Sequence, residues 1–190
     1  MLTPGSLQSA LATYWDEMTR CRNSGAYWAL LHVTVCLPDL CAALQSANGE
    51  ADGQRYAKWC DVYVANSLLS GKERYRMRCK VLHQGRATTD QASSRYAGFS
   101  FGQPSSQGHV DHLRVDSDCL NVDVGRLADE MQAGVVRWAK ALEANPNSAD
   151  ARHAFKNLPS LVRVRKLSFP IPMATGIAGM PQFVTTLKTS

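Results

Sequence analysis

A long apolar stretch occupies residues 26–46, AYWALLHVTVCLPDLCAALQS. Apolar side chains fall on nearly every side of a helix drawn through it, which predicts a helix buried at the centre of a bundle. Pro38 lies inside this stretch. Because proline removes a backbone hydrogen bond, we expect it to kink the helix or divide it in two. No uninterrupted apolar run reaches about 18 residues, so no membrane span is expected.

Helical spacing of apolar residues recurs on both sides of this stretch. It predicts helices at residues 6–22, 54–68, 72–82, 123–143 and 149–157. Residues 94–122 alternate in short runs instead, which predicts a small antiparallel β excursion before the last long helix. The sequence therefore predicts a mainly α fold, in which four or five helices form a bundle.

Length and charge divide the chain into two parts. Its 190 residues, 45% of them apolar, suit one globular domain with an appendage. We expect a helical domain at residues 1–157, which includes the β excursion, and a basic, proline-containing C-terminal arm at residues 158–190. Residues 151–190 carry a formal charge of +6 and no acid, against −1 for residues 1–150. This asymmetry points to an anionic partner.

The N-terminus and the cysteines indicate the compartment. Residues 1–5, MLTPG, lack the basic start and the apolar run of a secretory signal. None of the six cysteines forms a Cys-x-x-Cys pair, so reduced and mostly buried thiols are expected. We therefore expect a cytoplasmic protein. The four tryptophans lie on helical stripes, and all four are expected in the core: Trp15, Trp28, Trp59 and Trp138.

The densest cluster of charge is residues 72–86, KERYRMRCKVLHQGR. Arg78 and His83 stand about one and a half turns apart in this predicted helix, roughly 7–8 Å along its axis. At that distance both can reach one phosphodiester. The guanidinium would hold two phosphate oxygens, and the imidazole would move a proton near neutral pH. The alternative is a solvated basic helix whose histidine caps its C-terminal end. Three side chains of this helix are expected to face the core: Tyr75, Cys79 and Leu82.

The segment from Arg78 to His83, RCKVLH, followed by Gln84 and Gly85, resembles the Arg-x4-6-His motif of HEPN domains. Residues 26–46 resemble the central helix that precedes that motif, and the resemblance covers roughly residues 8–143. It implies a helical bundle that forms a homodimer, with two motifs in one cleft. It also implies a metal-independent endoribonuclease or RNA-binding protein of a toxin or phage-defence system. Arg78 would stabilise the phosphate charge, and His83 would transfer a proton or orient the 2′-hydroxyl, which leaves 2′,3′-cyclic phosphate and 5′-hydroxyl ends.

Other bases would contribute to RNA binding. They are Arg74, Arg76, Lys80 and Arg86 near the motif and Arg163, Arg165 and Lys166 in the arm. Arg76 also satisfies the loose spacing to His83, so either Arg76 or Arg78 is the motif arginine. The expected partners are a second copy of the chain, RNA and an acidic antitoxin-like protein.

No metal or cofactor is expected. His109, Asp111 and His112 come closest to a ligand set, but His112 points away from the other two in a strand, which makes a poor tetrahedral site. A different alternative comes from Cys79, which stands where active HEPN members usually carry a polar residue directly after the arginine. It favours a non-catalytic helical dimerisation or interaction module that binds protein or nucleotide.

Overall fold

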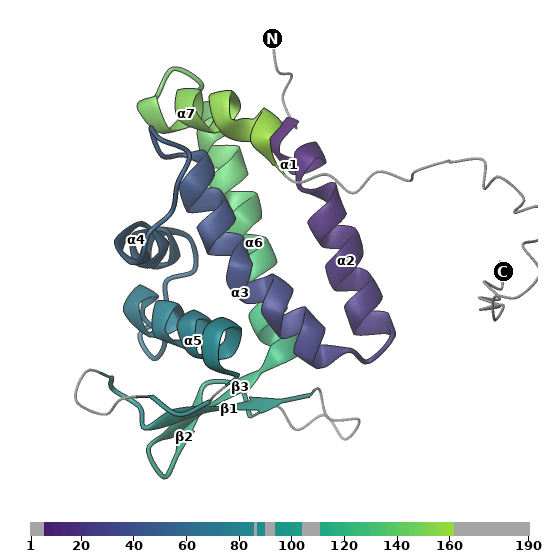
Figure 1. The fold of residues 1–190 in the computed structure, drawn as a ribbon, viewed down its shortest axis with the longest axis vertical. Helices are drawn as coiled ribbons and strands as arrows, with labels where there is room; N and C mark the ends of the chain where they lie inside the picture. The colour runs from purple at the N-terminus through teal and green to yellow at the C-terminus, as the bar shows by residue number, and fades with distance from the viewer. Residues whose placement is uncertain (1–5, 86, 90–93, 104–110, 162–190) are drawn as a thin grey trace, which may run out of the picture.

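The computed structural model of the chain describes residues 6–85, 87–89, 94–103 and 111–161 (Figure 1). Over these residues the protein is mainly helical, with helices α1 to α7, a short 3-10 helix and a three-stranded sheet. The mainly α class predicted from the sequence is confirmed. The described residues contain more helices than the predicted four or five, because short helices flank the long ones.

Helix α3, Tyr27–Leu44, lies at the centre of the bundle. It packs against α2, α4, α5, α6 and α7, which span Ala12–Asn23, Gly53–Tyr63, Gly71–Gln84, Val124–Ala144 and Ala149–Asn157. The helix is not divided at Pro38, contrary to one of the two sequence expectations. Leu37 and Cys41 are both buried by neighbouring helices, and this packing holds the chain helical on either side of the proline.

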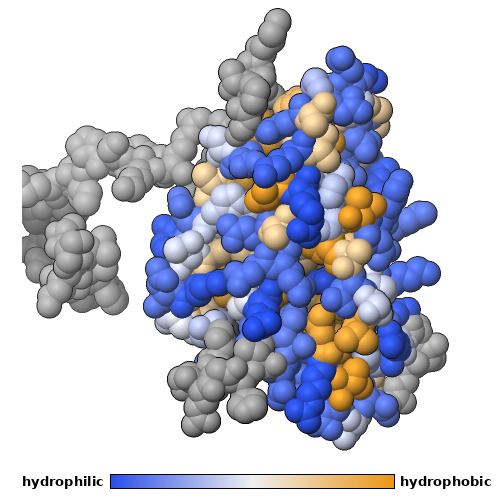
Figure 2. Space-filling view, turned by 180° about the vertical axis from the view of Figure 1, so that it is seen from behind, coloured by the Kyte–Doolittle hydropathy of each residue, from blue (hydrophilic) through white to orange (hydrophobic). Residues whose placement is uncertain are grey.

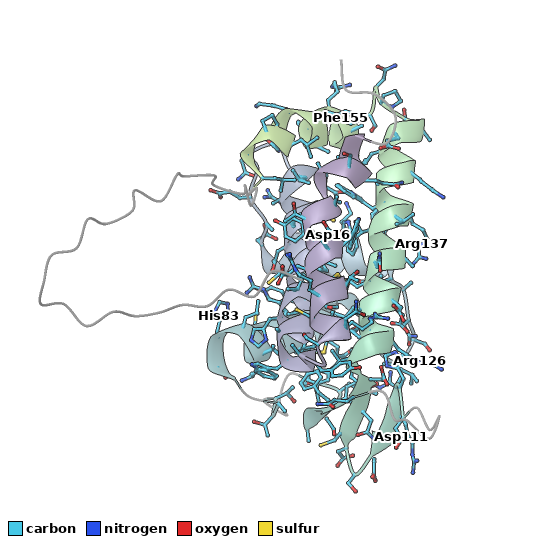
Figure 3. The ribbon with its side chains drawn as sticks, turned by 90° about the vertical axis from the view of Figure 1, so that its right-hand side faces the viewer. Asp16, His83, Asp111, Arg126, Arg137 and Phe155 are labelled. Carbon is cyan, nitrogen blue, oxygen red and sulfur yellow. The ribbon has the colours of Figure 1, made fainter. Side chains whose placement is uncertain are left out.

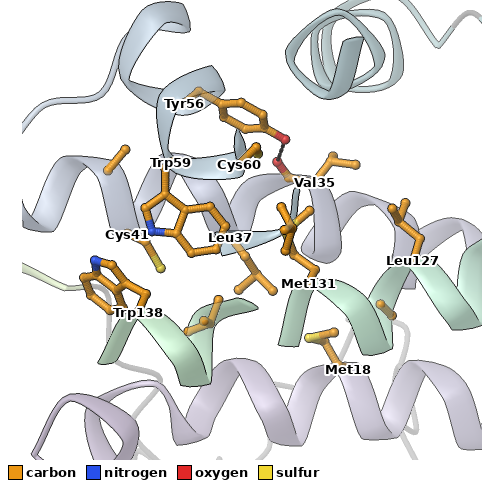
Figure 4. Close-up of a cluster of buried hydrophobic side chains, with 14 of the residues drawn as sticks. Met18, Val35, Leu37, Cys41, Tyr56, Trp59, Cys60, Leu127, Met131 and Trp138 are labelled. Carbon is orange, nitrogen blue, oxygen red and sulfur yellow. Dashed lines mark hydrogen bonds between the residues drawn. The ribbon is translucent and has the colours of Figure 1, made fainter. Parts of the chain in front are cut away.

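The core is built where α3, α4 and α6 meet (Figure 4). Trp59 of α4 and Trp138 of α6 are buried there, as predicted. The hydroxyl of Tyr56 donates a 3.1 Å hydrogen bond to the carbonyl of Val35, which ties α4 to the middle of α3. Gly71 begins α5 so close to α4 that a Cβ there would lie 2.0 Å from the carbonyl oxygen of Ala57. Only glycine permits this approach.

Several helix boundaries differ from the predicted ones. The helix predicted at residues 6–22 consists of α1, Ser6–Ala10, and α2, separated at the buried Leu11. Helix α4 ends at Tyr63, five residues before the predicted end. Helix α5 extends to Gln84, and Gly85 follows in the left-handed conformation with φ 57°, the usual glycine cap of a helix end.

The sheet has strand order β1-β3-β2, from Gly98–Gly102, Cys119–Asp123 and Arg114–Asp116. Strands β2 and β3 form an antiparallel hairpin, through a two-residue turn at Ser117 and Asp118 with positive φ. Strands β1 and β3 are parallel, so the prediction of a purely antiparallel excursion is wrong. The parallel register sets Phe99 beside Leu120, and both are buried against the bundle.

The end of the described chain closes the bundle. Helix α7 leads into a 3-10 helix, Leu158–Ser160, and Leu158 is buried in the core. Residues 158–161 therefore belong to the helical domain rather than to the arm, where the sequence placed them. The rest of the predicted arm, residues 162–190, lies outside the described residues.

The surface seen from behind the view of Figure 1 is largely hydrophilic, with apolar areas between the polar ones (Figure 2). Among the described helices, α3 alone has the length and composition to cross a membrane. Half of this helix is buried inside the bundle.

Candidate functional site

The structure brings Arg78 and His83 into direct contact near the C-terminal end of α5. Nη1 of Arg78 lies 2.8 Å from Nε2 of His83. Because a guanidinium has only donors, Arg78 donates this hydrogen bond and Nε2 accepts it. The imidazole is therefore in its neutral form, with its proton on Nδ1. His83 is exposed, and Figure 3 shows it at one side of the bundle, away from Arg126, Arg137 and Asp111.

Asp39 of α3 completes this group, which we call the outer cluster: Asp39, Arg78 and His83. Oδ2 of Asp39 accepts a 2.8 Å hydrogen bond from Nε of Arg78. Sequence reasoning missed Asp39, although it is the only formally charged residue between residues 26 and 46. An isolated acid in an apolar helix is a signal for a buried or half-buried ion pair.

Burial and charge set the protonation of this cluster. Burial raises the pKa of Asp39 by more than the nearby Arg78 lowers it. Burial alone would lower the pKa of Arg78, but the hydrogen bond and charge of Asp39 outweigh it and raise that pKa. Burial also raises the pKa of the adjacent Cys36 thiol, with a contribution from Asp39. Arg78 thus stays a cation, and Cys36 stays a neutral thiol at pH 7.

Arg76 and Lys80 stand beside the outer cluster without joining it. Nη1 of Arg76 lies 3.8 Å from Oε1 of Glu73, and Nζ of Lys80 donates a 3.1 Å hydrogen bond to Gln84. Both side chains are partly exposed. Of the two candidate arginines, Arg78 contacts His83, whereas Arg76 contacts Glu73. The other predicted RNA-binding bases, Arg86, Arg163, Arg165 and Lys166, lie outside the described residues.

Arg74 does not lie on the surface that the sequence assigned to it. Only 1% of its side chain is exposed, and Nη2 donates to the carbonyl of Val64 and to Oε2 of Glu130, at 3.2 and 3.3 Å. The buried face of α5 carries Arg74, Met77 and Val81, whereas the predicted core residues Tyr75, Cys79 and Leu82 are half-buried on its flank. The helix is thus turned so that one of its bases points inward.

Arg74 belongs to a second group, the inner cluster: Arg74, His112 and Glu130. Nε2 of His112 lies 3.0 Å from Oε1 of Glu130, and Nδ1 accepts a 3.1 Å hydrogen bond from the backbone N–H of Asp123. His112 is therefore neutral, with its proton on Nε2. Burial alone would raise the pKa of Glu130, but His112 and Arg74 outweigh it and lower that pKa.

The inner cluster contains His112, which is also one of the three residues of the possible metal site, His109, Asp111 and His112. Both ring nitrogens of His112 are already used, and Asp111 pairs with Arg114 at 3.2 Å. Within the described residues no group of three or more His, Cys, Asp or Glu side chains could hold a metal ion. His109, the third member of that candidate, lies outside the described residues.

Comparison of the chain with family models, curated proteins and solved structures finds no match in any of the three.

Proposed function

We propose that this protein is a HEPN-like, metal-independent endoribonuclease that works as a homodimer and binds RNA at the outer cluster. The observation that carries this proposal is the 2.8 Å contact between Arg78 and His83. It supplies an anion-binding cation and a neutral imidazole side by side, on a helix end that solvent reaches. The basic residues Arg76 and Lys80 flank this pair and would attract the RNA backbone.

Each side chain of the outer cluster has a distinct task in this reaction. Asp39 holds Nε of Arg78, which leaves the Nη groups to bind the two non-bridging oxygens of a phosphodiester. When the phosphate takes up these donors, Nε2 of His83 is released and can accept the proton of the ribose 2′-hydroxyl. The 2′-oxygen then bonds to phosphorus as the bond to the 5′-oxygen breaks, and that oxygen takes a proton from water. The products are a 2′,3′-cyclic phosphate and a 5′-hydroxyl.

A cleavage assay on pooled cellular RNA in excess EDTA tests the proposal. The wild-type protein should cut RNA and leave cyclic phosphate ends, whereas His83→Ala and Arg78→Ala should each lose at least about 100-fold in rate, the scale of a general base or a charge-stabilising group. His153→Ala, which removes a half-buried histidine on α7, is the matched control and should cut at the wild-type rate. Equal cleavage by His83→Ala, or cleavage that EDTA abolishes, would contradict the proposal.

A second function is favoured by the salt bridge between Arg78 and Asp39. Because Asp39 already balances the charge of Arg78, and Cys79 follows the arginine, the cluster suits a module that binds RNA, nucleotide or protein without turnover. In that case labelled RNA would bind but remain intact. His83→Ala would bind it as tightly as the wild type, and dimerisation would be unaffected.

A further inference from the structure

Trp28 is the one tryptophan that the bundle leaves exposed. The sequence predicts all four in the core, yet Trp59 and Trp138 are 1% and 0% exposed while Trp28 is 54% exposed. Among the described residues, only two other large apolar side chains are exposed, Val62 and Val115, and both are aliphatic. An indole open to solvent on a helix of the central bundle is available to stack with a ligand.

His32 holds the ring of Trp28 in place. The two rings meet edge to face, with centroids 4.6 Å apart and planes at 71°. Nδ1 of His32 lies 2.8 Å from the carbonyl oxygen of Trp28. Because that oxygen can only accept, His32 carries its proton on Nδ1, and the imidazole is fixed against the backbone as well as against the indole. The pair therefore presents a preorganised aromatic surface on a helix rather than on a loop.

Trp28 lies on the same stripe of α3 as Asp39, the member of the outer cluster that this helix contributes. Asp39 follows it by eleven residues, which is close to three full helical turns and about 16 Å along the axis. His32 lies between them on this stripe, and its side chain is partly exposed. In a stacked strand successive nucleotides are roughly 3.4 Å apart, so 16 Å corresponds to about five nucleotides, and to fewer in an extended strand. An RNA strand whose phosphate is held by Arg78 could therefore place a base over Trp28.

We infer that Trp28, braced by His32, is a stacking platform for a base of single-stranded RNA whose phosphate is bound at the outer cluster. This inference rests on the proposed function and adds the class of substrate. A base offers its face to an indole only when it is unpaired, and such stacking tolerates any sequence. A duplex hides these faces, so the platform selects single strands over duplexes.

Binding of a short, fluorescently labelled RNA with 2′-O-methyl riboses tests this inference without cleavage. Trp28→Ala should bind the single strand about 5- to 150-fold more weakly than the wild type, since one stacked base contributes that factor. Trp28→Phe should keep most of the affinity. Val62→Ala, an exposed aliphatic residue on α4, should bind as the wild type does and serves as the control.

Tryptophan fluorescence gives a second readout. The single strand should quench the emission of the wild type but not that of Trp28→Phe, whose remaining tryptophans are shielded to a greater degree. The same RNA annealed to its complement should not quench it. Unchanged affinity in Trp28→Ala, or equal quenching by the duplex, would overturn the platform. If wild-type protein cuts RNA while Trp28→Ala binds normally, the platform alone fails. If the wild type neither binds nor cuts RNA, the proposed function and the platform fail together.

Discussion

The outer and inner clusters contain the same three kinds of side chain. Each has an arginine from α5, a carboxylate from another helix and a histidine: Arg78, Asp39 and His83 in the outer cluster, and Arg74, Glu130 and His112 in the inner one. The two arginines are one helical turn apart. Each ties α5 to a different neighbour, α3 in the outer cluster and α6 in the inner one.

The two clusters differ in whether a ligand can reach their hydrogen-bonding groups. In the inner cluster both nitrogens of His112 are occupied, and Arg74, whose Nε and Nη1 have no hydrogen-bond partner, is only 1% exposed, so a ligand cannot reach those two donors. In the outer cluster His83 is exposed, and the hydrogen bonds of Arg78 with Asp39 and His83 use its Nε and Nη1. Residue type alone thus does not separate a structural cluster from a reactive one. Access to solvent does.

The sharpest test removes one carboxylate from each cluster. Glu130→Gln leaves Arg74 buried without a counter-charge and should lower the free energy of unfolding by about 2–4 kcal/mol, somewhat less than for a fully buried pair because Glu130 is 34% exposed. Asp39→Asn should lower it by only about 1 kcal/mol, because solvent reaches both members of that pair. Urea unfolding of the two variants measures both values. An equal or larger loss in Asp39→Asn would make the outer cluster a structural one.

The histidines extend the comparison. His112→Ala leaves the N–H of Asp123 and an oxygen of Glu130 without their partner and should destabilise the fold by about 1–3 kcal/mol. His83→Ala removes an exposed side chain and should change stability by no more than about 0.5 kcal/mol, while RNA cleavage is lost. Thermal unfolding beside the cleavage assay measures both. If His83→Ala also destabilised the fold strongly, its loss of activity would no longer identify a reacting group.

The two carboxylates should also respond to acid in opposite directions. The pKa of Glu130 is lowered in the fold, so its contribution to stability is present above the ordinary value of 4.5 and is lost as the pH falls below it. The pKa of Asp39 is raised, so its contribution is present below the ordinary value of 3.8 and is lost as the pH rises above it.

Urea unfolding of the wild type and of each variant, at a series of pH values on both sides of 3.8 and 4.5, checks this contrast. The stability difference between wild type and Glu130→Gln should shrink as the pH is lowered through 4.5. The difference between wild type and Asp39→Asn should shift in favour of the wild type as the pH is lowered toward 3.8, and should change little below that value. Parallel curves for the two variants would show that the clusters do not differ in their electrostatics.

The smallest expected effect concerns Lys80, beside the outer cluster. If Lys80 contacts one phosphate, Lys80→Ala should reduce the slope of log affinity for single-stranded RNA against log salt concentration by about 0.7. Lys140→Ala, which removes an exposed lysine from α6, should leave the slope unchanged. A fluorescence titration at several salt concentrations measures it. An unchanged slope in Lys80→Ala would show that the RNA does not contact this side of α5.

The sequence predicted those features that depend on neighbours along the chain. The 3.6-residue period placed the long helices, and the caps at Asp123 and Gly85 are local features of the same kind. The proximity of Arg78 and His83 was predicted for the same reason, since both lie on one helix, although their direct hydrogen bond was not. These predictions required no knowledge of which elements pack together.

Features that depend on distant parts of the chain were missed. Asp39 joins Arg78 across 39 positions, and Arg74 is buried only because Glu130, 56 positions away, receives its charge. A run of bases along a helix predicts a solvated face, and nothing local distinguishes Arg74 from Arg76. The prediction that Trp28 is buried in the core was wrong. Its apolar surroundings in the sequence predict burial, but no described helix covers the start of α3 on that side.

Asp123 gives the small sheet a part in the folding of the whole domain. It pairs with Gly102 as the last residue of β3, caps the first turn of α6 through Arg126, and gives its N–H to His112. Opening β3 therefore removes a helix cap and exposes the inner cluster in the same event. We therefore expect the sheet and the bundle to unfold as one cooperative unit, with the amides of β3 exchanging their hydrogens with solvent as slowly as those at the start of α6.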